Sequence, residues 1–231
     1  MKDEIVGNLK GVQRRIADTC VRCGRDAAAV RLVCVTKTMD ADTVRLAIQA
    51  GAGLFGENYI QEARDKCRIL AAYPVSWHFI GHLQSNKARY AVKLFDLIHT
   101  VDSLRLATEL DREARKIGKV QRVLIQVNIG KEAAKSGIHA ESAGSLICDI
   151  GSFSNLSVQG LMTIPPFFDE PERVRPFFRG LRELRDTLNL SGIAGVRLHE
   201  LSMGMTGDFE AAIEEGATLV RIGTAIFGER S

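Results

Sequence analysis

The sequence predicts an α/β fold, a single (β/α)8 TIM barrel with an extra N-terminal helix. Eight short apolar segments of strand length alternate with segments whose apolar residues recur at helical spacing. The alternation runs along the whole chain without a linker or a low-complexity insert, which favours one closed parallel sheet. The 231 residues also fit the roughly 250 residues of such a barrel. We expect one domain over 1–231, and a doubly wound open sheet is the alternative.

The first elements are predicted from two local patterns. Apolar residues at helical spacing place the extra helix at about 3–22, before a barrel that spans about 30–228. The first strand, 30–36, is an apolar and largely β-branched run that ends in Lys37, and a helix of about 42–50 follows it.

The later units follow the same rule, each a strand and then a helix. They are expected at 53–56 and 60–70, 77–81 and 85–94, 97–101 and 104–117, 123–127 and 141–149, 156–161 and 174–188, 196–201 and 208–213, and 219–223 with a closing turn at 224–227. Pro176 must begin or kink its helix, because proline has no N–H to donate. The longer connection 128–140 is a candidate lid.

Composition and charge narrow the possible partners. The 31 basic and 28 acidic residues give a net charge of +3 without a long run of like charge, so small molecules are expected and nucleic acid is not. The N-terminus lacks a signal-peptide pattern and no apolar stretch approaches membrane-spanning length, which predicts a cytoplasmic protein without a membrane partner. Five scattered cysteines suit a reducing compartment. Cys20 and Cys23 form a C-x-x-C pair, but no second pair follows at zinc spacing.

Lys37 is the first candidate functional residue. A lysine that closes a hydrophobic strand has a partly desolvated ammonium, which lowers its pKa and frees the amine as a nucleophile. This is the chemistry of a Schiff base. The alternative is a lysine that ends the strand and extends its charge to water.

The functional residues of a (β/α)8 barrel lie at the carboxyl ends of its strands. The residues expected there are Lys37, Glu57, Asn58, His82, Met162, Thr163, 202–207, Gly223 and Thr224. The last two loops are rich in Gly, Ser and Thr, whose backbone N–H groups and hydroxyls can hold a phosphate, although the same residues also form tight turns. A phosphate site opposite a Schiff-base lysine suggests pyridoxal phosphate.

Several motifs carry a family resemblance. They are TKT at 36–38, FGENY at 55–59, WHFIGHLQSNK at 77–87, KSG at 135–137, GLMTI at 160–164, LSMGM at 201–205 and RIGT at 221–224. With them the chain resembles the pyridoxal phosphate homeostasis protein family, single-domain relatives of the alanine racemase barrel. The block at 77–87 is the most specific, because it is long and rich in non-hydrophobic residues.

The resemblance implies a cofactor site, and no metal site is expected because no three histidines converge as ligands. It implies pyridoxal phosphate as an aldimine on Lys37, its phosphate held by Ser202, Gly223 and Thr224, and its ring surrounded partly by Asn58 and Arg221. The chain departs from the family pattern at Met39, Ala140 and Thr206, and none of these changes removes a group that the cofactor needs. The histidines His78, His99, His139 and His199 are expected to be core or rim residues.

Three functional classes remain open at this stage. The preferred one is a protein of intracellular pyridoxal phosphate homeostasis, which stores, buffers or delivers the cofactor without efficient turnover and has no catalytic residue. Other B6 vitamers, amino acids and recipient apo-enzymes are further candidate partners, and the sequence does not identify the recipients. An amino-acid racemase is the alternative, and a Schiff-base aldolase acting through Lys37 is the third.

Overall fold

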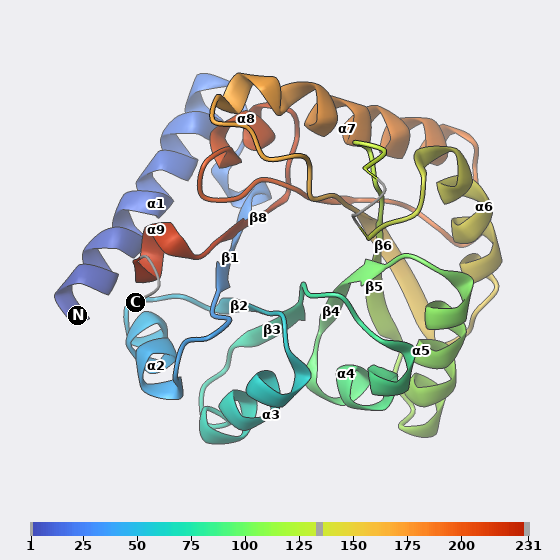
Figure 1. Ribbon diagram of the computed structural model, residues 1–231, viewed down its shortest axis with the longest axis horizontal. Coiled ribbons are helices and arrows are strands. Elements are labelled where there is room, and N and C mark those ends of the chain that lie inside the picture. The colour runs from blue at the N-terminus through green and yellow to red at the C-terminus, as the bar shows by residue number, and fades with distance from the viewer. Residues whose placement is uncertain (1, 133–135, 229–231) are drawn as a thin grey trace.

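The computed structural model describes residues 2–132 and 136–228, which form a closed barrel of parallel strands surrounded by helices (Figure 1). The strands are β1 (Arg31–Val35), β2 (Leu54–Glu57), β3 (Ser76–Phe79), β4 (Leu97–Val101), β5 (Gln121–Gln126), β6 (Leu156–Met162), β7 (Glu200–Ser202) and β8 (Leu219–Ile222). They pair in sequence order, and β8 pairs with β1 from Arg31 opposite Leu219 to Cys34 opposite Ile222. This last pairing confirms the predicted barrel and excludes the open sheet.

The helices lie outside the strands, as predicted. They are α1 (Lys2–Arg22), α2 (Ala41–Gln49), α3 (Ile60–Ile69), α4 (Ala88–Leu94), α5 (Leu104–Lys116), α6 (Ala140–Gly151), α7 (Arg175–Leu190), α8 (Phe209–Glu214) and α9 (Thr224–Phe227), with short 3₁₀ helices at Ala27–Ala29, Ser85–Lys87 and Pro171–Arg173. Pro176 lies in the first turn of α7, where its missing N–H costs no hydrogen bond. The expectation that this proline begins the helix is therefore confirmed.

The seventh strand is shorter than predicted. The apolar pattern placed it at 196–201, whereas β7 begins at Glu200. The side chain of Asn189, in α7, accepts from the backbone N–H of Leu198 and donates to the carbonyl oxygen of the same residue, both at 2.9 Å. The backbone groups of Leu198 are thus satisfied by a side chain and do not pair with β6, which His199 is the first to reach through a bond from its N–H to the Gln159 carbonyl oxygen.

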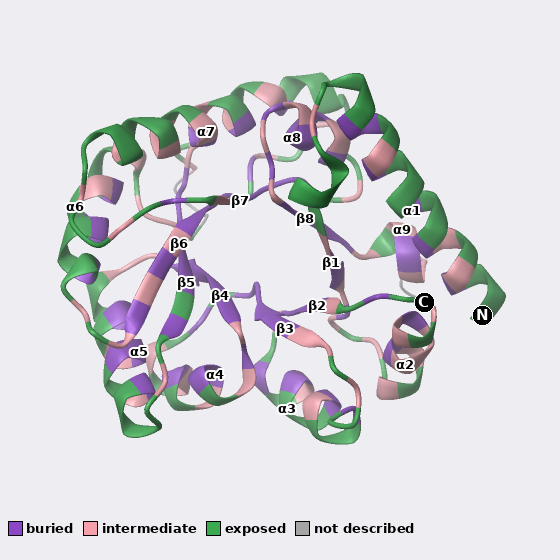
Figure 2. Ribbon diagram, turned by 180° about the vertical axis from the view of Figure 1, so that it is seen from behind, coloured by how far each residue is buried: buried purple, intermediate pink, exposed green. Residues whose placement is uncertain are grey.

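The core has two parts. Inside the barrel, Val33, Leu97, Leu124, Met162 and Leu219 form a small apolar cluster. The larger cluster fills the space between strands and helices, and Figure 2 shows the buried residues gathered along the strands and the inward helix faces. In this outer layer Trp77, the only tryptophan, packs against Phe55 with ring centroids 5.4 Å apart.

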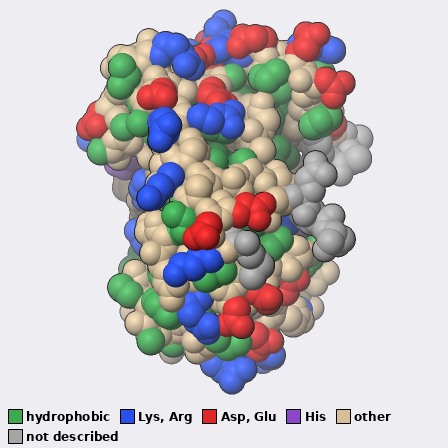
Figure 3. All heavy atoms as spheres, turned by 90° about the vertical axis from the view of Figure 1, so that its left-hand side faces the viewer, with side chains coloured by type: hydrophobic (Ala, Val, Ile, Leu, Met, Phe, Trp, Pro, Cys, Tyr) green, Lys and Arg blue, Asp and Glu red, His purple; other side chains and the backbone are tan. Residues whose placement is uncertain are grey.

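The extra helix α1 lies on the outside of the barrel against α2, α8 and α9 (Figure 1). Its apolar residues at helical spacing are buried, and Arg15 and Arg22 pair with Glu210 and Glu214 of α8. Figure 3 shows basic and acidic side chains interspersed on this side of the molecule. In the described part of the chain, no helix is both long and apolar enough to cross a bilayer.

Candidate functional site

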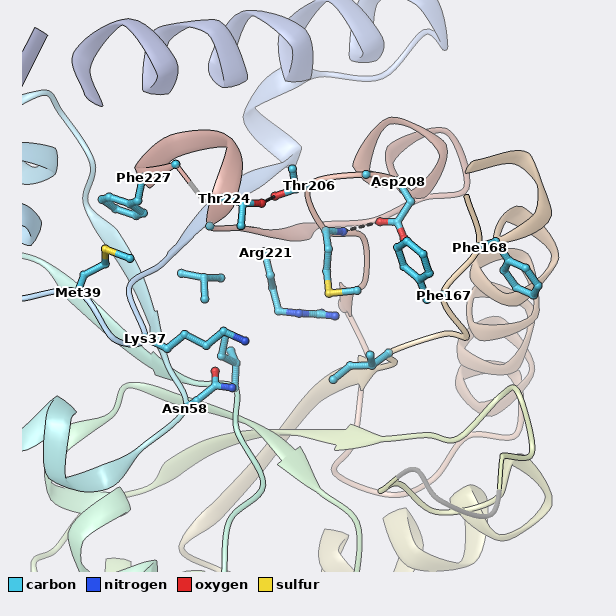
Figure 4. A pocket seen from close by; sticks show the side chains of 17 residues that line it. Lys37, Met39, Asn58, Phe167, Phe168, Thr206, Asp208, Arg221, Thr224 and Phe227 are labelled. Carbon is cyan, nitrogen blue, oxygen red and sulfur yellow. Dashed lines mark hydrogen bonds between the residues drawn. The ribbon is translucent and has the colours of Figure 1, made fainter. Parts of the chain in front are cut away.

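A cavity of about 340 Å³ opens at the carboxyl ends of the strands. Its lining includes five of the six predicted site residues, Lys37, Asn58, Arg221, Gly223 and Thr224. Figure 4 shows Lys37, Asn58 and Arg221 extending into the cavity, with Thr224 beside Thr206 on one wall. The remaining wall is largely apolar, with Met39, Ile164, Phe167, Phe168, Met205 and Phe227 among its residues.

A buried network holds the backbone that carries Lys37. Thr36, the preceding residue, is fully buried, and its hydroxyl donates to Glu57 Oε1 at 2.6 Å. The ammonium of Lys66, from α3, donates to the same carboxylate oxygen at 2.7 Å and to the carbonyl oxygen of Thr36. These bonds fix the end of β1 and therefore the point from which the Lys37 side chain extends.

The turn after Lys37 is held by a second carboxylate. Thr38 has a φ of 68°, a left-handed conformation that is unfavourable for a β-branched residue. Its backbone N–H donates to Glu62 Oε2 at 2.8 Å, and that oxygen lies 3.7 Å from Lys66 Nζ. Lys66 therefore helps to hold the residues on both sides of Lys37, Thr36 directly and Thr38 through Glu62.

Glu57 and Lys66 form a buried ion pair behind this turn. The Glu57 side chain has no exposed surface and that of Lys66 has 6%. Burial raises the pKa of the Glu57 carboxyl, although the Lys66 ammonium and the Thr36 hydroxyl act in the opposite direction. The charged form of Glu57 therefore depends on Lys66.

Asn58 approaches the cavity because residue 81 is a glycine. A Cβ atom at Gly81 would lie 2.3 Å from the carbonyl oxygen of Asn58, a distance at which the two atoms would clash. The side-chain oxygen of Asn58 is buried and finds no hydrogen-bond partner among the residues that the structure describes. Such an atom is costly unless a ligand supplies a donor, so it fits a binding role.

The loops after β7 and β8 place two hydroxyls side by side. Thr224 Oγ1 donates to Thr206 Oγ1 at 3.0 Å, and Asp208 closes the first loop by accepting from the Met205 N–H at 2.6 Å. Gly223 packs closely against β1, since a Cβ atom there would lie 3.2 Å from the Val35 carbonyl oxygen. Thr206 was expected at the strand ends within 202–207 but was not among the residues assigned to the cofactor, although its hydroxyl within a Gly-, Ser- and Thr-rich loop was a usable signal.

Ser202, the remaining predicted site residue, lies below the cavity. It is fully buried and is not among the residues that line the cavity. Its hydroxyl accepts from Arg221 Nη1 at 2.6 Å and lies 2.8 Å from His99 Nδ1. As the last residue of β7 it faces the barrel interior, so its side chain does not line the cavity, whereas that of Thr206 does.

Arg221 is a buried cation at the base of the cavity. Besides Ser202 it contacts the carbonyl oxygen of Thr163, to which Nη2 donates at 2.9 Å. Burial lowers the pKa of its guanidinium to about 10, so the group stays protonated at neutral pH. Burial also raises the pKa of Asp208 across the cavity. Arg221 and Lys37 therefore face one space that suits an anionic ligand.

Other sequence features lie away from this cavity. His82 is exposed and close to Ser136, while Lys135 of the KSG motif and part of the candidate lid lie outside the described residues. Cys20 is buried and Cys23 exposed, both as free thiols. Within the described ranges, no group of three or more His, Cys, Asp or Glu residues could hold a metal ion.

Comparison with known proteins places this chain in a family. The chain is 46% identical over 222 residues, 96% of each protein, to the "Pyridoxal phosphate homeostasis protein" of Aquifex aeolicus. The chain belongs to the pyridoxal phosphate homeostasis protein family. The Escherichia coli protein of the same name is 41% identical over 99% of this chain and 97% of its own length. The model of the "Alanine racemase, N-terminal domain" family also matches residues 12–231.

Solved structures extend the family comparison. PipY of Synechococcus elongatus, solved with PLP bound, superposes with a TM-score of 0.82 at 35% identity and covers 92% of this chain and all of its own. A protein from Bifidobacterium adolescentis gives a TM-score of 0.91 at 40% identity, over 98% of this chain and 95% of its own. An alanine racemase from Clostridium difficile, at 15% identity, shares the fold alone.

We expect Lys66→Met to destabilise the fold by about 3–5 kcal/mol at pH 7, because it leaves the Glu57 carboxylate buried without its counter-charge. The loss should be smaller at pH 5. Without the ammonium, burial keeps the folded-state pKa of Glu57 above its unfolded value, so stability falls as pH rises through that folded pKa. Urea denaturation at both pH values measures the effect.

Lys116→Met is the matched control for this experiment. Lys116 pairs with Glu113 at the same 2.7 Å, but its side chain is 59% exposed. Solvent screens such a pair, so this variant should unfold at nearly the wild-type urea concentration at both pH values. Equal losses of stability in the two variants would show that burial of the Glu57–Lys66 pair is not the reason for its contribution to stability.

Proposed function

We propose that this chain binds pyridoxal phosphate in the cavity at the carboxyl ends of the strands and serves its intracellular homeostasis as a store or carrier. The observation that carries the proposal is the meeting of Lys37, Arg221 and the paired hydroxyls of Thr206 and Thr224 in one space. Membership of the family and the PLP-bound structure of PipY support it. The cytoplasm is the proposed compartment.

The residues present fit the parts of this cofactor. Lys37 would hold the aldehyde carbon through its amine, with loss of water. The hydroxyls of Thr206 and Thr224 and the exposed backbone at Gly223 would hold the phosphate, whose charge Lys37 and Arg221 also favour. Asn58 offers its unpartnered side-chain oxygen, and Arg221 would face the ring.

The charge of Arg221 favours a carrier over an efficient catalyst. When bound, pyridoxal phosphate supplies an electrophilic carbon and, with its ring nitrogen protonated, a sink for electrons. A guanidinium beside the ring disfavours that protonation, because two positive charges would adjoin at low dielectric. Among the described residues, none of the three tyrosines lines the cavity as a candidate acid or base. A racemase is the second candidate, favoured by the shared barrel fold.

Other B6 vitamers and amino acids are proposed as further ligands of the same cavity. An amino acid carries an amine that could exchange with Lys37, and the largely apolar outer wall would accommodate its side chain. Apo-enzymes that receive the cofactor would complete a carrier function.

Lys37→Ala should abolish covalent attachment of pyridoxal phosphate while the barrel stays folded, since the buried bonds around Thr36 do not use the Lys37 side chain. Borohydride reduction followed by peptide mass mapping tests this, and circular dichroism checks the fold. Lys87→Ala is the control and should retain the adduct. Trapping of the cofactor on Lys87 in the wild-type protein would contradict the assignment of Lys37.

Thr206→Val and Thr224→Val should each weaken retention of pyridoxal phosphate by about 1–3 kcal/mol, because each removes a hydroxyl that can bond to a charged acceptor. A large side chain at Gly223 should weaken retention further by closing the approach next to Val35. Equilibrium dialysis measures these losses. Unchanged affinity in all three variants would place the phosphate elsewhere.

The carrier proposal also predicts negligible exchange of the α-proton of amino acids. Incubation of the loaded protein with each common amino acid in deuterated water, followed by NMR, measures this exchange. We expect rates far below the typical enzymatic range of roughly 1–1000 per second. Exchange within that range would restore the racemase as the better candidate.

A further inference from the structure

A chain of hydrogen bonds crosses the barrel interior directly below the cavity. It joins four buried residues on four strands, Arg221 on β8, Ser202 on β7, His99 on β4 and His78 on β3. The distances are 2.6 Å from Arg221 Nη1 to Ser202 Oγ, 2.8 Å from Ser202 Oγ to His99 Nδ1, and 2.9 Å from His99 Nε2 to His78 Nδ1. Neither histidine has a role in the function proposed above.

The direction of the bonds in this chain follows from Arg221 and from the proton of Ser202. A guanidinium can only donate, so Ser202 Oγ accepts from Arg221. Among the described residues, His99 Nδ1 is the one acceptor within hydrogen-bond distance of the Ser202 hydroxyl, so the buried proton of Ser202 is satisfied only if it points at His99 Nδ1. His99 therefore accepts at Nδ1, carries its proton on Nε2 and donates to His78 Nδ1. His78 must then carry its proton on Nε2 as well. Each histidine is thereby fixed in one neutral tautomer.

Burial keeps both histidines uncharged. It lowers the pKa of His78 to about 3 and that of His99 well below its ordinary value, and each has a positively charged neighbour that acts in the same direction, Arg31 for His78 and Arg221 for His99. The two acceptors that Arg221 contacts, the Ser202 hydroxyl and the Thr163 carbonyl, are also uncharged. Directional bonds thus hold the guanidinium while its charge remains available to the cavity.

We infer that His78, His99 and Ser202 are positioning residues that fix the Arg221 guanidinium toward the ring of the bound cofactor. The inference rests on the proposed function and gives Ser202 a role different from the phosphate contact expected from the sequence. A buried polar chain of this kind costs desolvation and contributes little apolar packing, so its value lies in the geometry that it imposes on Arg221.

Two probes separate a ring contact from a phosphate contact. Pyridoxal has the ring and aldehyde without the phosphate, and inorganic phosphate has only the anion. Ser202→Ala and His99→Phe should weaken binding of pyridoxal roughly 10- to 150-fold, as expected for the loss of one hydrogen bond to a charged group, and leave binding of inorganic phosphate unchanged. Thr206→Val should do the reverse. Isothermal titration calorimetry measures both affinities.

Two further variants control for damage to the core. His99→Gln keeps an acceptor for Ser202 and a donor for His78, so it should restore most of the pyridoxal affinity lost in His99→Phe. His199→Phe changes an exposed histidine at the opposite end of β7 and should leave both affinities unchanged. If His99→Gln is as weak as His99→Phe, the effect is one of packing and the inference fails.

Nitrogen-15 NMR of the histidine rings tests the chain in the wild-type protein without any ligand. His78 and His99 should both show the neutral Nε2–H tautomer at neutral pH. A proton on Nδ1 of His99 would overturn the inference, as would weaker phosphate binding with unchanged pyridoxal binding in Ser202→Ala. If the wild-type protein binds neither pyridoxal nor pyridoxal phosphate, the proposed function fails and the NMR result still decides whether the chain exists.

Discussion

Pairing of β8 with β1 determines which residues of this chain can meet. All eight strands are parallel, so their carboxyl ends lie on one rim, and closure brings the residue after the first strand next to those after the last. In an open sheet with β1 and β8 apart, Lys37 and Thr224 would not line one cavity. The close contact between Gly223 and the Val35 carbonyl oxygen shows that the residues after the last strand pack directly against the end of the first strand.

Two buried cations near the cavity, Lys66 and Arg221, differ in whether a carboxylate neutralises their charge. Lys66 is neutralised by the Glu57 carboxylate and serves to hold the backbone before Lys37. Arg221 is held by a hydroxyl and a carbonyl, which fix its direction without cancelling its charge. Of these two cations, Arg221 therefore contributes more to the electrostatic field inside the cavity, while Lys66 contributes rigidity. This division explains why two basic side chains so deep in the fold can have unrelated tasks.

The spacing of apolar residues was sufficient to predict most helices and strands. It also identified the strand-end residues, because the functional residues of a (β/α)8 barrel lie at the carboxyl ends of its strands. It was not sufficient where a contact between two elements decides the end of a strand or the direction of a side chain. Asn189 shortens β7, and the sequence gives no sign of that contact. The inward direction of Ser202 depends on where β7 ends, which the sequence did not show, whereas the hydroxyl of Thr206 in the following loop was visible in the sequence. The bond between His78 and His99 depends on the register of the neighbouring strands β3 and β4, which no local pattern gives.

The burial of Trp77 has a practical consequence. It is the single indole of the chain, it is 7% exposed, and the next residue, His78, belongs to the hydrogen-bonded chain below the cavity. Its fluorescence therefore reports from one known position in the molecule. Pyridoxal compounds absorb in the near ultraviolet, where tryptophan emits, so loading would quench this emission by resonance energy transfer, while unfolding would shift the emission to longer wavelength. Occupancy and integrity of the barrel can thus be followed separately in one unlabelled sample.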